Sequence, residues 1–332
     1  MIARAAAEIT VVIPSHERPW RLGRLLDALA AQTLDSVRFE VIVVHDSAGT
    51  RTATLLDEHS LAREGQLRTL RLAPGTGLPA RQRNVGWRAA QSPLIAFTDD
   101  DCRPDRDWLA RALEAIACHP GSFVQGATRP EPGELCLLRR PLARTLTVDP
   151  PTVHAQTCNM VYPRDLLERL GGFDERMPAP AGEDTELALR ATEAGARQVG
   201  APAAIVYHAV TVPSLAHALR DLGRWQHLAY VVKRHPRLRA ELYGRVFWKP
   251  AHAWLLMALL ATGLSLGSPR KSRQPALLAL VVPWAWTTMP SYGPSVRGRL
   301  RAVTELPLRA LIDTGELLVA LRGSLRYRTL FL

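Results

Sequence analysis

Three consecutive carboxylates, Asp99, Asp100 and Asp101, are the residues of this chain with the clearest capacity for chemistry. They follow a short apolar run, Pro93 to Ala96, which is typical of a buried strand. Adjacent carboxylates repel one another, and a divalent cation is the usual partner that makes such a cluster favourable. Their oxygens suit Mg²⁺ or Mn²⁺, which also take substrate phosphates as ligands. Taken alone, the cluster is equally typical of a solvated acidic turn before the helix that we expect near Asp107.

Strands and helices alternate along the part of the chain that would position this cluster. Apolar, β-branched runs predict strands at residues 9–13, 39–44, 67–72, 94–98 and 123–126. Apolar residues at helical spacing and the turns between the strands predict helices at 21–31, 52–63 and 80–90. This alternation indicates βαβ units and a parallel sheet, and such sheets bind ligands at the carboxyl ends of their strands. No Gly-x-Gly-x-x-Gly follows the first strand, which excludes the dinucleotide-binding fingerprint.

The chain of 332 residues is 47% hydrophobic and 22% charged, as expected for a globular protein. Its net charge of +11 is unevenly distributed: residues 251–332 hold ten basic and three acidic residues, so 10 − 3 = +7. A basic tail suggests an anionic partner, either membrane or nucleic acid, but no recognition motif favours nucleic acid. The four cysteines form no Cys-x-x-Cys pair, which argues against a structural zinc site and fits a reducing cytosol.

Two apolar stretches mark the tail, at residues 251–266 and 275–289. Both are shorter than the roughly 20 residues of a spanning helix, and Arg270, Lys271 and Arg273 lie between them. We therefore expect interfacial or re-entrant helices with arginines at the lipid headgroups, namely Arg297, Arg299 and Arg301. Four tryptophans suit such an interface: Trp248, Trp254, Trp284 and Trp286. The alternative is a helical subdomain packed on the sheet or on a second subunit.

Five motifs, in order, resemble those of the family 2 glycosyltransferases. These are Val11 to Pro19, Phe39 to Asp46, Arg83-Asn84-Val85-Gly86, Asp99-x-Asp101, and Gly171 to Glu175 with Gly182 to Asp184. The resemblance covers roughly Ile9 to Lys233. It implies an α/β GT-A fold, a Rossmann-like, mostly parallel sheet flanked by helices, followed by a helical hydrophobic C-terminal tail. We expect a nucleotide-sugar glycosyltransferase domain at 1–240 and a basic, membrane-associating region at 241–332.

The resemblance also implies roles for single residues on the donor side. Asp101 and Asp99 would hold Mg²⁺ or Mn²⁺ against a nucleotide-diphosphate sugar, and His208 would complete the metal shell. The residues expected to bind the nucleotide sugar are Pro14, Ser15, His16, Arg18, Asp46, Arg83, Asp99 and Asp100. One departure concerns the base contact, since the family usually has two acidic residues after the second strand and this chain has His45-Asp46.

On the acceptor side, the resemblance favours Asp184 as general base, beside Glu183, at the start of a helix that runs to about Ala194. A lone base opposite the leaving group implies one displacement with inversion. The plainer interpretation is that these carboxylates cap the helix and complement its dipole. Residues 128–153 are rich in Pro and Arg and predict a mobile loop over the site.

The predicted function is an inverting transfer of a sugar to a hydroxyl of a glycan or lipid-linked acceptor, at the cytoplasmic side of an anionic membrane. One alternative is a membrane-tethered binding protein without turnover, for which His45 leaves room. Another is a sugar nucleotidyltransferase. That class often has a Gly-rich, basic loop directly after the first strand, where this chain offers only Arg18 and Arg21. A phosphatase is less favoured, because no Thr follows the carboxylates.

Overall fold

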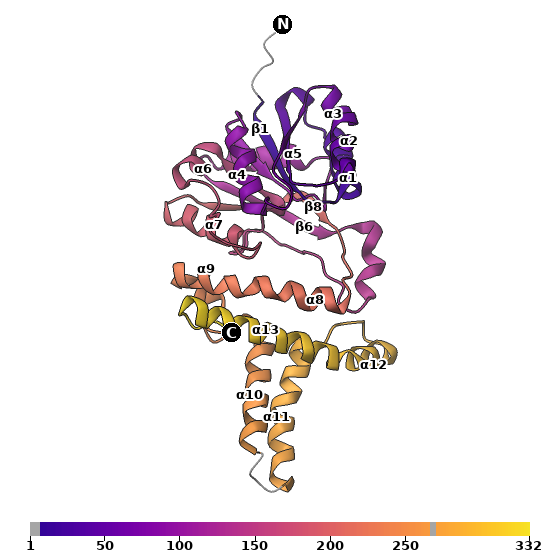
Figure 1. The fold of residues 1–332 in the computed structure, drawn as a ribbon, viewed down its shortest axis with the longest axis vertical. Helices are drawn as coiled ribbons and strands as arrows, with labels where there is room; N and C mark the ends of the chain where they lie inside the picture. The colour runs from indigo at the N-terminus through magenta and orange to yellow at the C-terminus, as the bar shows by residue number, and fades with distance from the viewer. Residues whose placement is uncertain (1–6, 266–269) are drawn as a thin grey trace. The chain divides into compact units, whose positions relative to one another are not determined.

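A computed structural model describes residues 7–265 and 270–332 (Figure 1). Their contacts divide the chain into two compact units. The first consists of the residues up to Leu138 with Ala143–Thr211, and the second of Arg139–Leu142 with Val212–Leu332. Residues 212–240 therefore group with the C-terminal helices, ahead of the domain boundary expected at 240.

The first unit is a sheet with helices on its faces (Figure 1). Its strands are β1 (Ile9–Ser15), β2 (Phe39–His45), β3 (Leu67–Arg71), β4 (Leu94–Phe97), β5 (Cys102–Pro104), β6 (Phe123–Pro130), β7 (Met160–Pro163) and β8 (Gln198–His208). Its α-helices are α1 (Pro19–Ala30), α2 (Thr50–Glu58), α3 (Ser60–Arg63), α4 (Pro79–Ala89), α5 (Trp108–Cys118), α6 (Arg164–Leu170) and α7 (Glu183–Glu193). Three 3₁₀ turns complete it: η1 (Ser36–Arg38), η2 (Pro132–Arg139) and η3 (Thr157–Asn159).

The strand order is β3-β2-β1-β4-β7-β6-β8-β5. Strands β1 to β4 pair in parallel, as the sequence predicts. Beyond β4 the sheet becomes mixed, because β7 pairs antiparallel with both β4 and β6, and β5 pairs antiparallel with β8. The short strands β5 and β7 carry too little periodicity to be predicted from the sequence.

Strand β1 is buried on both faces, which explains its nearly continuous apolar sequence. Val11 and Ile13 belong to one apolar core, with the leucines of α1, whereas Val12 belongs to the other, with Trp87 of α4. Helix α4 lies very close to the sheet at Gly86, where a Cβ atom would stand 2.3 Å from Val12 Cγ1. This close approach accounts for the glycine of the Arg-Asn-x-Gly motif.

The second unit is built from helices. They are α8 (Leu215–Leu222), η4 (Gly223–His227), α9 (Leu228–Arg234), η5 (Pro236–Glu241), α10 (Pro250–Ser265), α11 (Arg270–Thr288), α12 (Val296–Thr304) and α13 (Leu306–Tyr327). Within this unit α10 and α11 lie side by side as a hairpin, and α13 packs against α8, η4 and α9 (Figure 1). Gly323 allows α13 to approach η4, since a Cβ there would lie 2.3 Å from Gln226 O.

Several predicted elements differ in detail. The helix expected at 52–63 is divided by His59, which has extended backbone angles and whose Nδ1 accepts from Leu61 N. The loop expected at 128–153 begins inside β6 and continues into η2, and Glu131, between these two elements, pairs with Arg103. Trp284 is buried and donates to Asp313, so it is not available to an interface. In the part of the chain that the structure describes, no helix combines the length and apolarity that crossing a bilayer requires.

Asn159 connects three elements of the sheet unit. Its Oδ1 accepts from Trp108 Nε1 of α5 at 2.8 Å, and its Nδ2 donates to Ala127 O of β6 and Ala204 O of β8. We predict that Asn159→Ala lowers the free energy of unfolding by about 3 kcal/mol, because three buried polar groups lose their partner. Urea unfolding measures this change. The exposed Gln91→Ala is the control and should stay within about 0.5 kcal/mol of the parent; an equally small effect at Asn159 would contradict the prediction.

Candidate active site

The carboxyl ends of β1, β2 and β4 bring the predicted donor-side residues together. Because these strands are parallel and adjacent, Ser15, Asp46 and the Asp99–Asp101 cluster follow their strands at the same edge of the sheet. Ser15, Asp46 and Asp100, three of the residues that the sequence predicts to bind a nucleotide sugar, thus share one edge, although they lie up to 85 positions apart.

Asp100 is the buried member of the acidic cluster. Its Oδ2 accepts from Ser15 Oγ at 3.0 Å and from His16 N at 3.1 Å, and Arg18 Nη1 lies 3.2 Å from Oδ1. Burial, and secondly the neighbouring Asp101, raise the pKa of Asp100 to about 6, against the opposing effect of Arg18. Asp100 therefore shapes the loop after β1, and its predicted contact with the nucleotide sugar stays a prediction.

Asp101 lies beside His208 because β5 pairs with β8, with Cys102 opposite His208. Asp101 Oδ1 is 3.7 Å from His208 Nε2, while Asp101 Oδ2 accepts from Arg18 Nη1 at 2.7 Å. The other imidazole nitrogen, Nδ1, is 2.8 Å from Ala209 O. A carbonyl can only accept, so Nδ1 donates to Ala209 O, and Nε2 is the ring nitrogen that faces Asp101.

Asp46 is fixed at the end of β2 by three donors. His16 Nδ1 lies 2.7 Å from Oδ1, Gln82 Nε2 donates to the same oxygen, and Gly77 N donates to Oδ2 at 3.0 Å. Burial opposes ionisation, but the hydrogen bonds from His16 and Gly77 outweigh it and lower the pKa of Asp46. The carboxylate at this edge is therefore charged.

His45 and Pro14 are less accessible than the sequence suggests. His45 is 1% exposed, and its Nδ1 has no hydrogen-bond partner among the described residues. Burial and secondly Arg71 lower the pKa of His45, so the ring is neutral. Pro14 is the buried, penultimate residue of β1.

The guanidinium of Arg83, on α4, connects the donor side with the acceptor side. Nη2 donates to Asp99 Oδ1 at 2.7 Å, and Nη1 lies 3.1 Å from Glu183 Oε1 and 3.3 Å from Asp184 Oδ1. Arg83 is 4% exposed, so its positive charge lies in a medium of low dielectric constant. Its electrostatic attraction to the carboxylates is therefore stronger than it would be in water. The three carboxylates also raise the pKa of Arg83, despite its burial.

Asp184 is held at the start of α7 by a second element, η3. Thr157 donates from its backbone N to Oδ2 at 3.1 Å and from Oγ1 to Oδ1 at 2.7 Å. Burial raises the pKa of Asp184, and it raises the pKa of Glu183 to about 7. The Asp184 side chain is 22% exposed against 8% for Glu183, so Asp184 is the more accessible carboxylate of the two.

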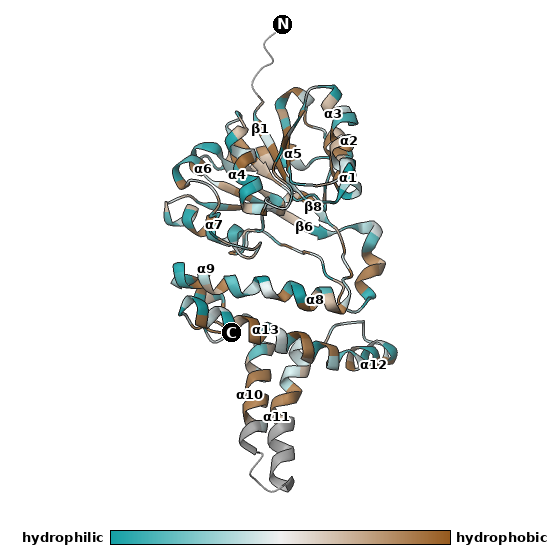
Figure 2. Ribbon diagram, viewed as in Figure 1, coloured by the Kyte–Doolittle hydropathy of each residue, from teal (hydrophilic) through white to brown (hydrophobic). Residues whose placement is uncertain are grey.

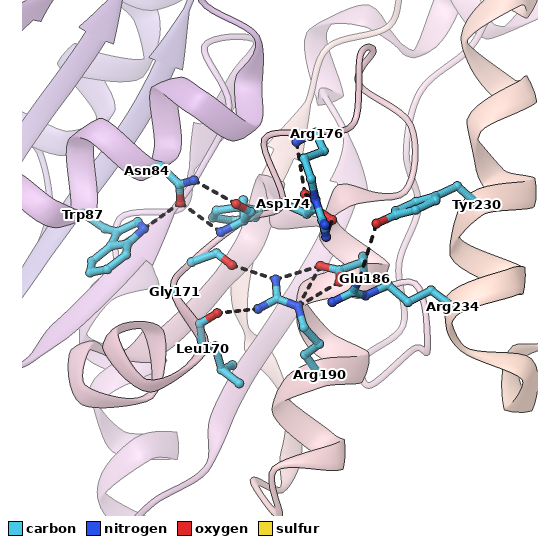
Figure 3. Close-up of polar contacts among 12 residues, drawn as sticks. Asn84, Trp87, Leu170, Gly171, Asp174, Arg176, Glu186, Arg190, Tyr230 and Arg234 are labelled. Carbon is cyan, nitrogen blue, oxygen red and sulfur yellow. Dashed lines mark hydrogen bonds and ion pairs between the residues drawn. The ribbon is translucent and has the colours of Figure 1, made fainter.

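Asn84 pins the Gly-Gly-Phe segment that precedes α7 (Figure 3). Its Oδ1 accepts from Trp87 Nε1 at 2.8 Å and from Phe173 N at 2.9 Å, while its Nδ2 donates to Phe173 O. Gly172 has φ +77°, and a Cβ there would lie 2.3 Å from Asn84 Oδ1. The Arg-Asn-x-Gly motif and the Gly-Gly-Phe segment, which are far apart in the sequence, therefore contact each other directly.

Arg190 closes the same segment from α7 (Figure 3). It forms a bidentate ion pair with the fully buried Glu186, and it donates to Leu170 O and to Gly172 O, each at 2.7 Å. The i,i+4 spacing of Glu186 and Arg190 is a signal that sequence analysis could have used. Thr157, by contrast, gives no signal, since a lone Thr in an irregular segment indicates nothing about its partner.

Two family models match the sequence over most of this arrangement. Glycosyl transferase family 2 matches residues 10–171, and glycosyl transferase family group 2 matches residues 145–292. The chain belongs to glycosyl transferase family 2.

Curated relatives in this family act in different settings. The chain is 30% identical over 273 residues to the pre-mycofactocin glycosyltransferase of Mycobacterium tuberculosis. The matched region covers 77% of this chain and 54% of that relative. It is 26% identical over 192 residues to the glycosyltransferase AglE of Haloferax volcanii, covering 56% of this chain and 62% of AglE. The chain thus spans between half and two thirds of the length of these relatives.

Solved structures of the GT-A class share the fold. The mannosyltransferase PcManGT of Pyrobaculum calidifontis, in complex with GDP-Man and Mn²⁺, superposes with a TM-score of 0.57 at 19% identity, covering 97% of this chain and 87% of that one. Residues 1–349 of TarS from Staphylococcus aureus, in complex with UDP, give a TM-score of 0.51 at 19% identity, covering 97% and 91%. The GT-A fold expected from the sequence is confirmed.

The residues at the end of β4 have the chemistry that a divalent cation requires. One ligand atom each from Asp101, Cys102 and His208 lie within 4.8 Å of one another. A carboxylate oxygen and an imidazole nitrogen are ligands that suit Mn²⁺ or Mg²⁺. Cys102, by contrast, is buried, and its contact with Cys158 and its burial hold the pKa of its thiol well above the usual range. Asp101 and His208 therefore fit such an ion, with Asp99 as the remaining candidate.

Arg83 is the residue whose removal should damage the site most. Arg83→Met leaves three carboxylates without their buried cation, and we predict a loss of about 3–5 kcal/mol in the free energy of unfolding. Adding Glu183→Gln removes one of the unpaired charges and should recover part of the loss. Arg88→Met, on the exposed side of the same helix, is the matched control and should cost less than about 1 kcal/mol. Equal effects of the two arginine variants in urea unfolding would refute the central position of Arg83.

Proposed function

We propose that this protein transfers a sugar from a nucleotide-diphosphate sugar to a hydroxyl of a glycan or lipid-linked acceptor, with inversion at the anomeric carbon. The observation that carries the proposal is the juxtaposition at Arg83: a carboxylate of the acidic cluster and a carboxylate pair on α7 meet on one buried guanidinium. A donor bound at the first and an acceptor bound at the second would approach each other from opposite sides.

On the donor side, Asp101, Asp99 and His208 would hold the ion. A bound Mg²⁺ or Mn²⁺ supplies Lewis-acid neutralisation of the pyrophosphate leaving group. Arg18 Nη1 contacts both Asp100 and Asp101, and its side chain is half-exposed, so it is free to turn toward a phosphate while Asp101 takes the ion. Ser15, His16 and Asp46 would surround the nucleoside, with His16 and Gly77 keeping Asp46 ionised.

On the acceptor side, Asp184 would act as general base. It accepts the proton of the acceptor hydroxyl while that oxygen forms a bond to the anomeric carbon and the bond to the diphosphate breaks. Thr157 and Arg83 restrict the carboxylate to one orientation, which is what a base aimed at a single hydroxyl needs. Because burial raises the pKa of Asp184, the transfer rate should fall as the pH falls through a value above the ordinary range of an aspartate.

The C-terminal region supports the proposed acceptor and location. The surplus of +7 in residues 251–332 supports a peripheral or re-entrant position on the cytoplasmic side of an anionic membrane. A lipid-linked acceptor would be concentrated on that surface. The relatives that match this chain include enzymes named for transfer to pre-mycofactocin and to poly(ribitol-phosphate), so family membership alone does not choose the acceptor.

The metal role is tested with a panel of nucleotide sugars, assayed for Mn²⁺-dependent hydrolysis and for thermal stabilisation of the protein. Asp101→Asn removes one charge at nearly constant volume, and we predict loss of Mn²⁺-dependent nucleotide binding and of turnover with the fold intact. Asp165→Asn, at an exposed position on α6, is the control. If the parent protein binds nucleotide equally well with and without chelator, the acidic cluster holds no ion.

The base is tested separately. Asp184→Asn should leave donor affinity near that of the parent and reduce transfer about 10²-fold or more, the usual scale of a lost general base. Glu193→Gln, at the exposed end of the same helix, controls for the loss of a carboxylate from α7. A drop in donor affinity with unchanged transfer per bound donor would instead assign Asp184 to capping the helix.

A further inference from the structure

The C-terminal helices expose apolar side chains in an ordered pattern. On α13 four leucines are exposed, Leu311, Leu318, Leu321 and Leu325, the last of them 73% exposed. Their spacings of seven, three and four residues place them on one side of the 22-residue helix. The opposite side carries Ala320 and Gly323, and Leu317 lies at the border of the exposed stripe; all three are buried within the same unit. Helix α13 therefore has two apolar sides, and only one of them is covered.

Helix α12 repeats this pattern. Its buried residues are the small ones: Ala302, and Gly298, where a Cβ would stand 2.6 Å from Tyr292 O. Its exposed residues include Val296, Leu300 and Val303, at the i, i+4 and i+7 positions of one stripe. A helix on the surface of a soluble protein presents polar residues there instead.

The hairpin of α10 and α11 exposes a third set of apolar residues in the same unit. Leu259, Leu260, Val282 and Trp286 are exposed, and the described parts of both helices are largely apolar (Figure 2). Within this unit the hairpin extends away from α13, and α12 and α13 run crosswise to it (Figure 1). If α12 and α13 lie flat on a surface, the hairpin points into that surface.

A buried polar cluster fastens the hairpin to α13. Asp313 accepts from Lys249 Nζ at 2.9 Å, from Trp284 Nε1 at 2.9 Å and from Thr288 Oγ1 at 2.8 Å. Glu316, one turn further along α13, pairs with Lys249 and with His252 at the start of α10. The hairpin and α13 are therefore held as one body at this point.

The same cluster removes the acidic charge from the surface. Asp313 and Glu305 are buried and Glu316 is mostly covered, and these are the three acidic residues of positions 251–332. Six arginines of α12, α13 and the residue that ends α13 are exposed: Arg297, Arg299, Arg301, Arg322, Arg326 and Arg328. The exposed charge of these two helices is therefore entirely positive.

We infer that the uncovered sides of α12 and α13, with the adjoining flank of the hairpin, dock on the surface of an anionic lipid bilayer. The apolar stripes enter the acyl boundary, and the arginines between and beside them meet headgroup phosphates. A second copy of this chain is a poorer occupant, because it would bring the same arginines into a like-charged interface. The inference rests on the membrane location in the proposed function and names the residues that produce it.

Two variants of the full chain separate the apolar from the electrostatic contribution. Leu318→Gln/Leu321→Gln/Leu325→Gln changes only exposed side chains, as does Arg297→Gln/Arg299→Gln. Vesicles of equimolar phosphatidylglycerol and phosphatidylcholine are the probe, with pure phosphatidylcholine as reference, in a sedimentation assay at several salt concentrations. Two variants on the exposed surface of the sheet unit serve as controls: Arg51→Gln/Arg63→Gln matches the arginine variant, and Val37→Gln is a single change of the apolar-to-Gln kind.

We expect the parent to prefer the anionic vesicles. The arginine variant should bind them about thirtyfold more weakly and respond less to salt, since each arginine near an anionic surface contributes about a factor of five. The leucine variant should lose about tenfold or more and be released fully by high salt, whereas the parent keeps a fraction that salt does not release. The controls should match the parent, and thermal unfolding of all variants should be unchanged.

Parent protein that ignores both vesicle types, or variants that bind as the parent does, would overturn the inference. So would a parent dimer in light scattering that the leucine variant dissociates, because a second copy would then cover the stripe. Mn²⁺-dependent hydrolysis of nucleotide sugar, measured on the same preparations without vesicles, keeps this outcome apart from the enzymatic proposal. Hydrolysis without vesicle binding refutes only the docking surface, and vesicle binding without hydrolysis refutes only the transfer reaction.

Discussion

The site depends on one buried cation. Arg83 neutralises three carboxylates that come from the loop after β4 and from the start of α7. Glu183 is buried and Asp99 and Asp184 are partly covered, so their charges could not lie this close together without it. Its planar guanidinium has two terminal nitrogens at a fixed spacing, so it also sets the distance between the groups that it binds. A lysine would supply the charge but not this fork. The arrangement of donor side and acceptor side therefore follows from the shape of a side chain as much as from its charge.

The rest of the sheet unit serves to bring that side chain into place. Helix α4 approaches β1 closely only because residue 86 has no side chain, and this approach directs Arg83 over the strand ends. The antiparallel pairing of β5 with β8 returns the chain so that His208 meets Asp101. The short turn η3 supplies both Thr157, which holds Asp184, and Asn159, which joins β6, β8 and α5. Stability and site geometry thus share the same few residues.

Much of this could be predicted from the sequence, for a physical reason. Parallel strands that are buried on both faces have apolar sequences. Strands β1, β2 and β4 could therefore be predicted from the sequence, together with the polar residues that follow them. Pairs of interacting residues that are distant in the sequence could not be predicted. Arg83 and Glu183 are 100 positions apart and Thr157 and Asp184 are 27 apart, and no local pattern encodes such a pair. The tail was expected to be helical, but the bounds of α12 and α13 were not predicted, because their arginines interrupt the apolar positions and no long apolar run marks them.

The contact between Asn84 and Gly172 has a consequence for recombining members of this family. Arg83 and Asn84 are neighbours on one turn of α4, yet both of them bind residues of the later half of the sheet unit. In the sequence, helix α4 lies among the first strands. Its side chains, however, also contact the Gly-Gly-Phe segment and α7. A chimera that joins two parents just after the acidic cluster would separate Asn84 from the backbone shape it was selected to fit. A crossover placed before Pro79 takes helix α4 and the Gly-Gly-Phe segment from the same parent. It is therefore the better position at which to exchange the part of the chain that includes the acceptor side.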